Sequence, residues 1–231
     1  RSVTVSPDNK HVYATGYLDH AVAVFSRNTV SGELTFVQVL KDGEGGVDGL
    51  SVAYYVTVSP DNKHVYATGL GDSAVAVFSR DVSSGQLTFV QVLKDGVDGV
   101  DGLNGASSVI VSPDGLHAYA TGLSDNAVAV FSRDATSGFL TFVQVLKAGV
   151  DGVDGLSLPY SVTLSPNGLH AYATGFFDNA VAVFSRDAAS GQLTFVQVLK
   201  DGVGGVDGLS AAVSVTLSPD GLHAYAAAYG N

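Results

Sequence analysis

The stretch Ser161–Gly175, SVTLSPNGLHAYATG, occurs in near-identical form at residues 2–16, 55–69 and 108–122, and a shortened copy begins at Ser214. The Ser-Pro pairs of these copies start at Ser6, Ser59, Ser112, Ser165 and Ser218, a constant step of 53 residues. A fixed period of this size indicates a repeat protein whose units stack on one another. We therefore predict one repeat domain over residues 1–231, with repeats 2–54, 55–107, 108–160 and 161–213 and a partial copy at 214–231.

Each repeat contains four strand signals separated by turn signals. In the first repeat they cover residues 2–5, 11–15, 21–25 and 34–40, and the Ser-Pro-Asp-Asn turn follows the first of them. No segment shows the apolar spacing of a helix. Four strands per unit are typical of a β-propeller blade, because a single sheet buries both faces only between two neighbours. The sequence thus predicts an all-β protein, a β-propeller or open propeller-like arc of about 4.5 four-stranded antiparallel repeats. A β-solenoid or β-sandwich fits the hairpins and the strict period less well.

The run SVTVSPDNKHVYATG, followed by DHAVAVFSRNTVSGELTFVQVL, resembles the repeat of the lactonase-like, YVTN-type β-propellers. The resemblance extends over essentially the whole chain. It implies that the first strand of each blade lines a central channel and that the fourth lies at the outer rim. It also implies a lactonase-like hydrolase as one possible function.

The composition restricts the partners of the chain. The net charge of −11 and the pI near 4.6 argue against nucleic acid and anionic membranes, which need clustered Lys and Arg. No apolar run is long enough to insert into a membrane. Cysteine and methionine are both absent, so disulfides and thiolate metal sites are excluded. This composition fits our expectation of a secreted or cell-surface protein.

Histidine and arginine recur at fixed positions of the repeat. The histidines are His11, His64, His117, His170 and His223, and the arginines are Arg27, Arg80, Arg133 and Arg186. Equivalent histidines on successive blades lie too far apart to share one metal ion. We interpret each histidine as bonded to its adjacent turn, and each arginine as part of a solvated or blade-to-blade ion pair. No Ser-His-Asp triad is recognisable.

Asp-Gly loops connect the repeats. Carboxylates separated by glycine can surround calcium, which binds six to eight oxygen atoms. The acids closest in sequence are Asp98 with Asp101 and Asp151 with Asp154. The sequence therefore predicts that these two loops bind calcium more tightly than the other inter-repeat loops. Solvated turns without a metal are the alternative interpretation.

A second set of residues is expected on the same face as these loops. It comprises the acids Asp19, Asp72, Asp125 and Asp178 and the aromatic residues Tyr17, Phe176 and Phe177. Such a face predicts binding of a carbohydrate or protein ligand, repeated from blade to blade.

The near-identity of the repeats decides the predicted function. An enzyme needs different side chains converging on one substrate, whereas first-strand residues such as Val3, Thr4 and Val5 offer no such set. We predict a non-enzymatic repeat scaffold or multivalent binding protein, with a lactonase-like hydrolase as the alternative.

The partial fifth repeat should prevent a simple closed five-bladed ring. Its unfilled sheet edge predicts self-association, or a longer parent chain with two upstream strands.

The glycines that end the second strand of each repeat are Gly16, Gly69, Gly122 and Gly175. We expect each of them either to adopt a positive φ or to face a close neighbour.

Overall fold

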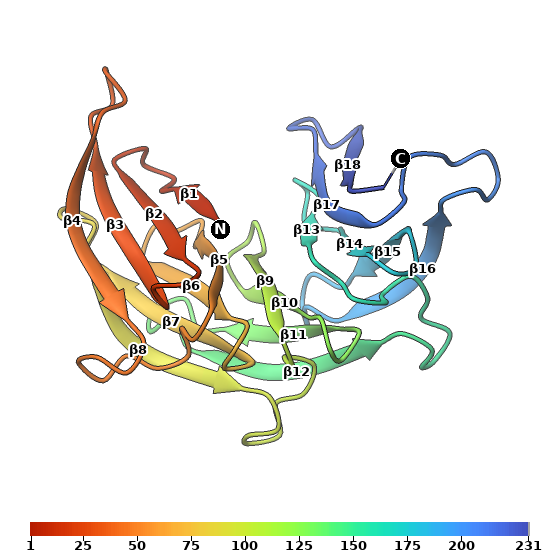
Figure 1. Ribbon diagram of the computed structural model, residues 1–231, viewed down its shortest axis with the longest axis horizontal. Helices are drawn as coiled ribbons and strands as arrows, with labels where there is room; N and C mark the ends of the chain where they lie inside the picture. The colour runs from red at the N-terminus through yellow and green to blue at the C-terminus, as the bar shows by residue number, and fades with distance from the viewer. Residues whose placement is uncertain (231) are drawn as a thin grey trace.

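The computed structural model describes residues 1–230 and consists of antiparallel sheets arranged as the blades of an open arc (Figure 1). Blade 1 contains β1 (Val3–Val5), β2 (His11–Gly16), β3 (Ala21–Arg27) and β4 (Leu34–Lys41); blade 2 contains β5 (Ala53–Val58), β6 (His64–Gly69), β7 (Ala74–Arg80) and β8 (Leu87–Lys94). Blade 3 contains β9 (Ala106–Val111), β10 (His117–Gly122), β11 (Ala127–Arg133) and β12 (Leu140–Lys147); blade 4 contains β13 (Val162–Leu164), β14 (His170–Gly175), β15 (Ala180–Arg186) and β16 (Leu193–Lys200). The chain then forms the two strands β17 (Ala212–Leu217) and β18 (Ala224–Ala228).

The strands of each blade pair in chain order, so the first is innermost and the fourth outermost (Figure 1). Contacts between blades run along the inner strands, from β1 to β5, β9, β13 and β17. The last sheet contains only β17 and β18, and the two ends of the arc do not join. The predicted all-β propeller-like arc is thus confirmed, and so is the absence of a closed five-bladed ring. Within residues 1–230 no helix could cross a membrane.

The third strand of each repeat explains why the blades stack. Its sequence Ala-Val-Ala-Val-Phe is apolar on both faces, and in β7 and β11 all five of these residues are buried. One face packs on the preceding blade and the other on the following blade, which gives a separate apolar cluster at each junction. The fourth cluster, beside β17, is much smaller because the fifth sheet lacks its outer strands.

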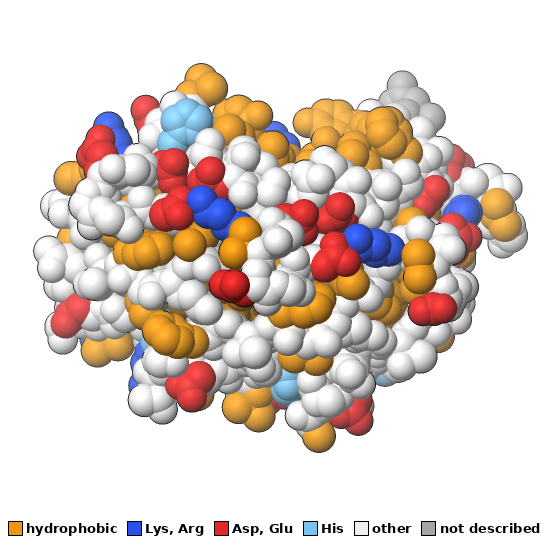
Figure 2. Space-filling model, turned by 90° about the horizontal axis from the view of Figure 1, so that it is seen from below, with side chains coloured by type: hydrophobic (Ala, Val, Ile, Leu, Met, Phe, Trp, Pro, Cys, Tyr) orange, Lys and Arg blue, Asp and Glu red, His pale blue; other side chains and the backbone are white. Residues whose placement is uncertain are grey.

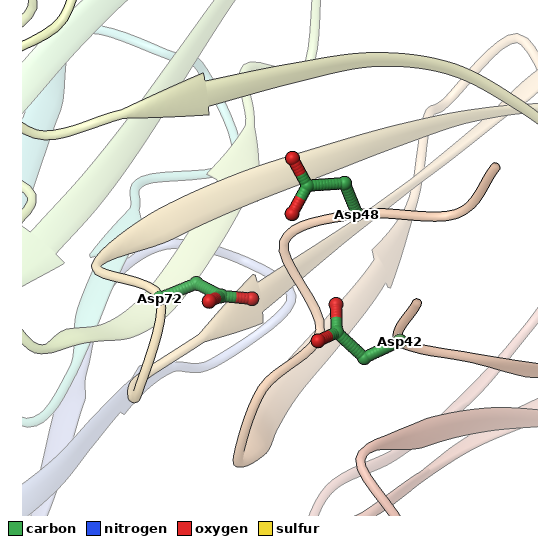
Figure 3. Close-up of side chains that lie close together, drawn as sticks. All are labelled: Asp42, Asp48 and Asp72. Atoms are coloured by element: carbon green, nitrogen blue, oxygen red, sulfur yellow. The ribbon is translucent and has the colours of Figure 1, made fainter. Parts of the chain in front are cut away.

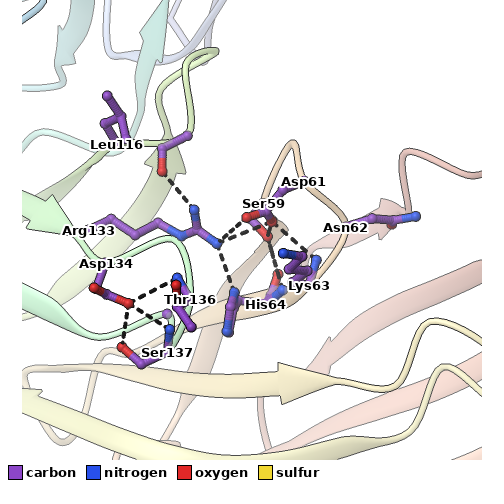
Figure 4. A network of polar contacts seen from close by, with 12 residues as sticks. Ser59, Asp61, Asn62, Lys63, His64, Leu116, Arg133, Asp134, Thr136 and Ser137 are labelled. Carbon is purple, nitrogen blue, oxygen red and sulfur yellow. Dashed lines mark hydrogen bonds and ion pairs between the residues drawn. The ribbon is translucent and has the colours of Figure 1, made fainter.

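Each pair of complete blades is joined by a buried arginine, which we call the arginine latch (Figure 4). In the second latch Arg133 of blade 3 donates to three side chains of blade 2: its Nε lies 2.6 Å from Tyr66 Oη, and its Nη2 lies 2.9 Å from Asp61 Oδ2 and 2.8 Å from His64 Nδ1. The first and third latches repeat these contacts, with Arg80 on Asp8, His11 and Tyr13, and with Arg186 on Asp114, His117 and Tyr119.

These latches correct part of the sequence interpretation. The imidazole rings of His11, His64 and His117 bond the arginine of the following blade, and only the backbone N–H groups of these residues donate to the serine of their own turn. Arg80, Arg133 and Arg186 do form blade-to-blade ion pairs, whereas Arg27 donates to Asn9 O of its own blade at 3.2 Å. Arg80, Arg133 and Arg186 are each followed in the chain by an aspartate that is not the ion-pair partner. Asp134, for example, accepts the backbone N–H groups of Thr136 and Ser137 and closes its own hairpin (Figure 4).

The hydrogen bonds of each latch determine the protonation states of its histidine, aspartate and tyrosine. Arginine has only donors, so each latch histidine accepts at Nδ1 and is neutral. Burial and the arginine charge both lower the pKa of His64. Burial opposes ionisation of Asp61, but hydrogen bonds from Ser59 and Arg133 outweigh it and lower its pKa. Burial raises the pKa of Tyr66 to about 12, so its hydroxyl stays protonated and donates to Gly138 O at 2.9 Å.

The glycines at the ends of the second strands face close neighbours, and none of the four has a positive φ. A Cβ atom on Gly122 would lie 2.4 Å from the carbonyl oxygen of Gly102 in the loop between blades 2 and 3. A Cβ atom on Gly16 would meet only the side chain of Asp19, with its Cβ nearest at 3.2 Å. The close-neighbour expectation is thus confirmed, most clearly at Gly69, Gly122 and Gly175.

Gly122→Ala should destabilise the protein by about 1–3 kcal/mol, because the new methyl group meets rigid backbone. Gly16→Ala is the matched control and should change the free energy of unfolding by less than about 0.5 kcal/mol. Urea denaturation of both variants measures the difference. Equal midpoints for the two would contradict the assignment.

Stability should fall as the pH falls below about 6.5, the ordinary pKa of histidine. The folded-state pKa values of His11, His64 and His117 are lowered, so the unfolded chain binds protons first and acid favours unfolding. The lowered pKa values of Asp8, Asp61 and Asp114 add a second loss below about pH 4.

His64→Gln should flatten the first of these losses by about a third, since one of three equivalent titrations is removed. Thermal melts between pH 5 and 8 measure the slope. His223→Gln, at the exposed fifth copy of the position, is the control and should follow the parent curve. A His64→Gln curve parallel to the parent would show that the latch histidines do not control the acid response.

Candidate functional site

A cavity of about 780 Å³ opens among the innermost strands, on the axis of the arc. Side chains of β5, β9 and β17 line it, together with Arg1 and residues 160–163 and 176. Its polar groups are hydroxyls and one guanidinium, and its described lining contains no carboxylate or imidazole. The cavity can therefore hold a small molecule between aromatic walls and a single positive charge.

Aromatic rings form a continuous belt at this cavity. Ring centroids lie 6.3 Å apart for Tyr17 and Tyr54, 6.5 Å for Tyr54 and Tyr160, 5.4 Å for Tyr160 and Phe176, and 5.3 Å for Phe176 and Phe177. Most of these pairs meet edge to face, a favourable geometry for aromatic rings. The belt brings together the three aromatic residues that the sequence singled out, Tyr17, Phe176 and Phe177. Sequence reasoning missed Tyr54 and Tyr160, which join them.

Arg1 supplies the charge of the cavity. Its guanidinium carbon lies 4.2 Å from the centroid of the Tyr54 ring, and its Nη2 donates to the Tyr54 hydroxyl. The backbone nitrogen of Arg1 donates to Thr15 O at 2.9 Å. These contacts hold the guanidinium at the cavity wall, where it can bind an anionic ligand.

One position of the repeat accounts for the asymmetry of the cavity. Residue 1 and its equivalents at steps of 53 are Arg1, Tyr54, Ser107, Tyr160 and Val213. All of them except Ser107 line the cavity, while Ser107 is buried and donates to Pro159 O. Four residue types (Arg, Tyr, Ser and Val) occur among these five positions, whereas the latch residues scarcely change. Variation within an otherwise uniform repeat was the signal that could have identified it.

The acids predicted for the ligand face have mainly structural contacts. Asp72, Asp125 and Asp178 each accept a backbone N–H of the preceding inter-blade loop, from Ser51, Asn104 and Ser157 at 2.9, 3.1 and 2.8 Å. Asp19 is exposed beside Gly16. A carbohydrate or protein ligand at these acids stays a prediction.

The four acids predicted for calcium divide into two kinds. Asp98 and Asp151 are exposed at the tips of their loops with positive φ. Asp101 and Asp154 instead accept Lys147 Nζ and Lys200 Nζ at 2.7 and 2.9 Å. In Figure 2 acidic side chains gather around isolated basic ones on one face, as such pairs require. The predicted pairs therefore have different surroundings, and the lysines already neutralise one member of each.

Two groups of three carboxylates lie close together, and one of them includes Asp101. Ligand atoms of Asp42, Asp48 and Asp72 lie within 4.8 Å of one another, and their side chains point toward a common space in Figure 3. Asp95, Asp101 and Asp125 repeat this arrangement at the next junction. Burial raises the pKa of Asp125 and the neighbouring Asp95 raises it further, against the hydrogen bond from Asn104. The third junction has Ala148 where the others have Asp42 and Asp95.

Calcium binding in these loops stays a prediction, and the structure sharpens its test. If the triads bind the ion, calcium should raise the Tm relative to chelator, because only the folded chain assembles them. Asp42→Ala with Asp95→Ala should abolish this increase, since it converts both junctions to the form of the third. Asp98→Asn with Asp151→Asn tests the original pairs. A parent Tm that calcium does not change would identify the loops as solvated turns.

Comparison with known proteins adds to this geometry. Residues 1–96 match the family described as lactonase, 7-bladed β-propeller. The 6-phosphogluconolactonases of Klebsiella pneumoniae (strain 342) and Pectobacterium carotovorum subsp. carotovorum (strain PC1) are 24% and 23% identical to 97% and 96% of this chain. The chain spans 62% and 61% of the length of these relatives. The periplasmic gluconolactonase of Pseudomonas aeruginosa is 25% identical, with a TM-score of 0.73 over 97% of this chain and 62% of that one.

These findings overturn the prediction of a non-enzymatic scaffold, because the named relatives are lactonases. The prediction assumed that near-identical repeats offer no unique set of side chains. The cavity contradicts that assumption, since the equivalent residues Arg1, Tyr54, Tyr160 and Val213 bring three kinds of side chain to it. The alternative drawn from the repeat motif agrees better with the findings, and the resemblance of this chain to the lactonase-like β-propellers is confirmed.

Proposed function

We propose that the chain acts in the hydrolysis of a sugar lactone, with the axial cavity as the substrate site. The observation that carries the proposal is the combination of one guanidinium with an aromatic belt at the centre of a lactonase-like arc. The names of the relatives support the same reaction class.

Hydrolysis of a lactone adds water to the ring carbonyl and breaks the bond between the carbonyl carbon and the ring oxygen. The product is an open-chain hydroxy acid. Negative charge develops on the carbonyl oxygen in the transition state, where a fixed positive group lowers the barrier. In the cavity Arg1 is the group that can stabilise this charge, or hold an anionic substituent of the substrate.

The aromatic walls suit the rest of the substrate. A lactone ring presents C–H groups on its faces, and the rings of Tyr54, Tyr160 and Phe176 provide flat apolar surfaces for them. Hydroxyls of Ser161, Thr163 and Thr216 in the lining can bond the substrate hydroxyls. We assign binding and orientation to these residues, and no proton transfer, because none of them is an efficient base at neutral pH.

The proposal predicts that Arg1→Gln lowers kcat/KM by about tenfold or more, through loss of a charge-assisted hydrogen bond. Glucono-δ-lactone and its 6-phosphate are the substrates, and acid release above the uncatalysed rate is the readout. Lys63→Gln, which removes an exposed positive charge on the Ser-Pro turn of blade 2, is the control and should leave the rate unchanged.

The two substrates separate the roles of Arg1. If the guanidinium holds a phosphate, the loss should be larger for the phosphorylated lactone; if it stabilises the carbonyl oxygen, the two losses should be equal. A chain that neither opens these lactones nor binds their acid products would refute the proposal.

A further inference from the structure

Strained backbone precedes two of the aromatic residues in the cavity wall. Tyr54 and Tyr160 line the cavity and belong to the aromatic belt. Two residues before them, Val52 and Leu158 each have a φ of 55°, in the left-handed region. Branched or bulky side chains rarely adopt this region, and such strain persists only where neighbouring groups hold the backbone. The direction in which the two tyrosines leave the backbone therefore depends on what holds Val52 and Leu158.

Each strained residue is held by one side chain of the preceding blade. The N–H of Val52 donates to His20 Nδ1 at 2.7 Å, and the N–H of Leu158 donates to Asn126 Oδ1 at 2.9 Å. His20 and Asn126 occupy equivalent places, in the turns between β2 and β3 and between β10 and β11. Because a backbone N–H only donates, Nδ1 of His20 is an acceptor here, like the amide oxygen of Asn126. We call these two contacts the tethers.

The tether of Leu158 acts on two members of the belt. The carbonyl oxygen of Leu158 accepts the N–H of Phe176 at 3.3 Å, and Tyr160 follows two residues later in the chain. The rings of Tyr160 and Phe176 meet edge to face, with their centroids 5.4 Å apart. A shift of Leu158 would therefore move both rings.

The tether of Val52 acts on Tyr54 through a bulge. The pairing of β5 with β6 shifts register between Ala53 and Tyr55, so Tyr54 is the extra residue. A bulge of this kind sets the direction in which a side chain points. The ring of Tyr54 lies beside the guanidinium of Arg1, whose carbon is 4.2 Å from the ring centroid. A shift of Val52 would therefore change the wall where the positive charge of the cavity is held.

The junction between blades 2 and 3 has the same kind of hydrogen bond without the strain and away from the cavity. Ser73 Oγ accepts the N–H of Gly105 at 3.1 Å. Glycine adopts a positive φ at little cost. Ser107, two residues later, is buried and is not among the residues that line the cavity. This junction therefore separates an effect on the cavity from an effect on the packing of blades.

We propose that His20 and Asn126, neither of which lines the cavity, are positioning residues that hold Tyr54 and Tyr160 in the orientation that binds the lactone. The inference rests on the proposed function of the cavity. Each residue acts as a hydrogen-bond acceptor, so another side chain that presents an acceptor at the same place should replace it. Loss of the acceptor should weaken substrate binding more than it slows the reaction, because the belt contacts parts of the substrate that do not react.

Steady-state kinetics with glucono-δ-lactone test the two positions. His20→Ala and Asn126→Ala should each raise KM by about threefold or more and change kcat by less than about twofold, as expected for the loss of one hydrogen bond used in binding. His20→Asn, which installs the acceptor that blade 3 uses, should restore the KM of the parent. Ser73→Ala is the matched control and should also retain that KM.

NMR of the belt provides a readout that does not need activity. In protein with ¹³C-labelled tyrosine rings, the signals of Tyr54 are those that disappear in Tyr54→Phe. His20→Ala should shift these signals, because the ring moves relative to Arg1 and the neighbouring aromatic rings. His20→Asn and Ser73→Ala should leave the signals at their parent positions. Thermal melts of each variant establish that the chain is folded at the temperature of both measurements.

An unchanged KM in both His20→Ala and Asn126→Ala would overturn the proposal. So would a His20→Asn variant as impaired as His20→Ala, since the imidazole itself would then be required. A Ser73→Ala variant with the same rise in KM would also overturn it, because loosened blades would then explain the effect. If the parent opens no lactone, the proposed function fails, and the Tyr54 signals alone decide whether His20 positions the ring.

Discussion

A buried arginine that bonds three side chains of the preceding blade and one carbonyl of its own blade is the constraint on which this structure depends. The side chain of Arg133 is fully buried, and Asp61, His64 and Tyr66 come from the preceding sheet. Removing one partner of a buried ion pair typically costs about 3–5 kcal/mol, because the remaining charge is left without compensation. If neighbouring blades separated or slid past each other, this charge would be exposed to solvent or left without its ion-pair partner. Three copies of the same contact set give three similar junctions, and the shape of the arc follows from them.

The uniformity of the junctions confines chemical variety to a few positions. Residues of the second and third strands serve the latch and the apolar clusters, so they recur from blade to blade. The residue at the start of the first strand, at positions 1, 54, 107, 160 and 213, serves neither, so it is free to differ. Arginine, tyrosine and valine at this position produce one asymmetric cavity inside a repeated framework. A repeat can thus be nearly exact and still build a site for one substrate.

The strands were predictable because their information is local. Alternating apolar residues and the Ser-Pro turns located every element of blade 1 to within two residues at each end. The partners of polar side chains were not predictable in this way, because they lie one blade away. His11 was assigned to its own turn but bonds Arg80, and Asp101, expected at a calcium ion, bonds Lys147. These pairs are 69 and 46 residues apart, and only the packing of successive blades brings them together. The aromatic belt was missed for the same reason.

Near-identical repeats also bring a difficulty for folding, since the latch residues Asp8, His11 and Tyr13 of the first copy recur as Asp220, His223 and Tyr225 in the fifth. The few residues that differ must then decide between the correct partner and its copies. Thr15 is one of them: its hydroxyl accepts the N–H of Ser2 at 2.9 Å and donates to Tyr54 O at 3.2 Å, which ties β2 to its own hairpin and to the next blade. The fifth copy has Ala227 at this position and lacks both bonds. Closing a short loop also costs less entropy than recruiting a distant strand. The native hairpin is therefore favoured by locality and by one hydroxyl, while the latch itself is neutral between the copies.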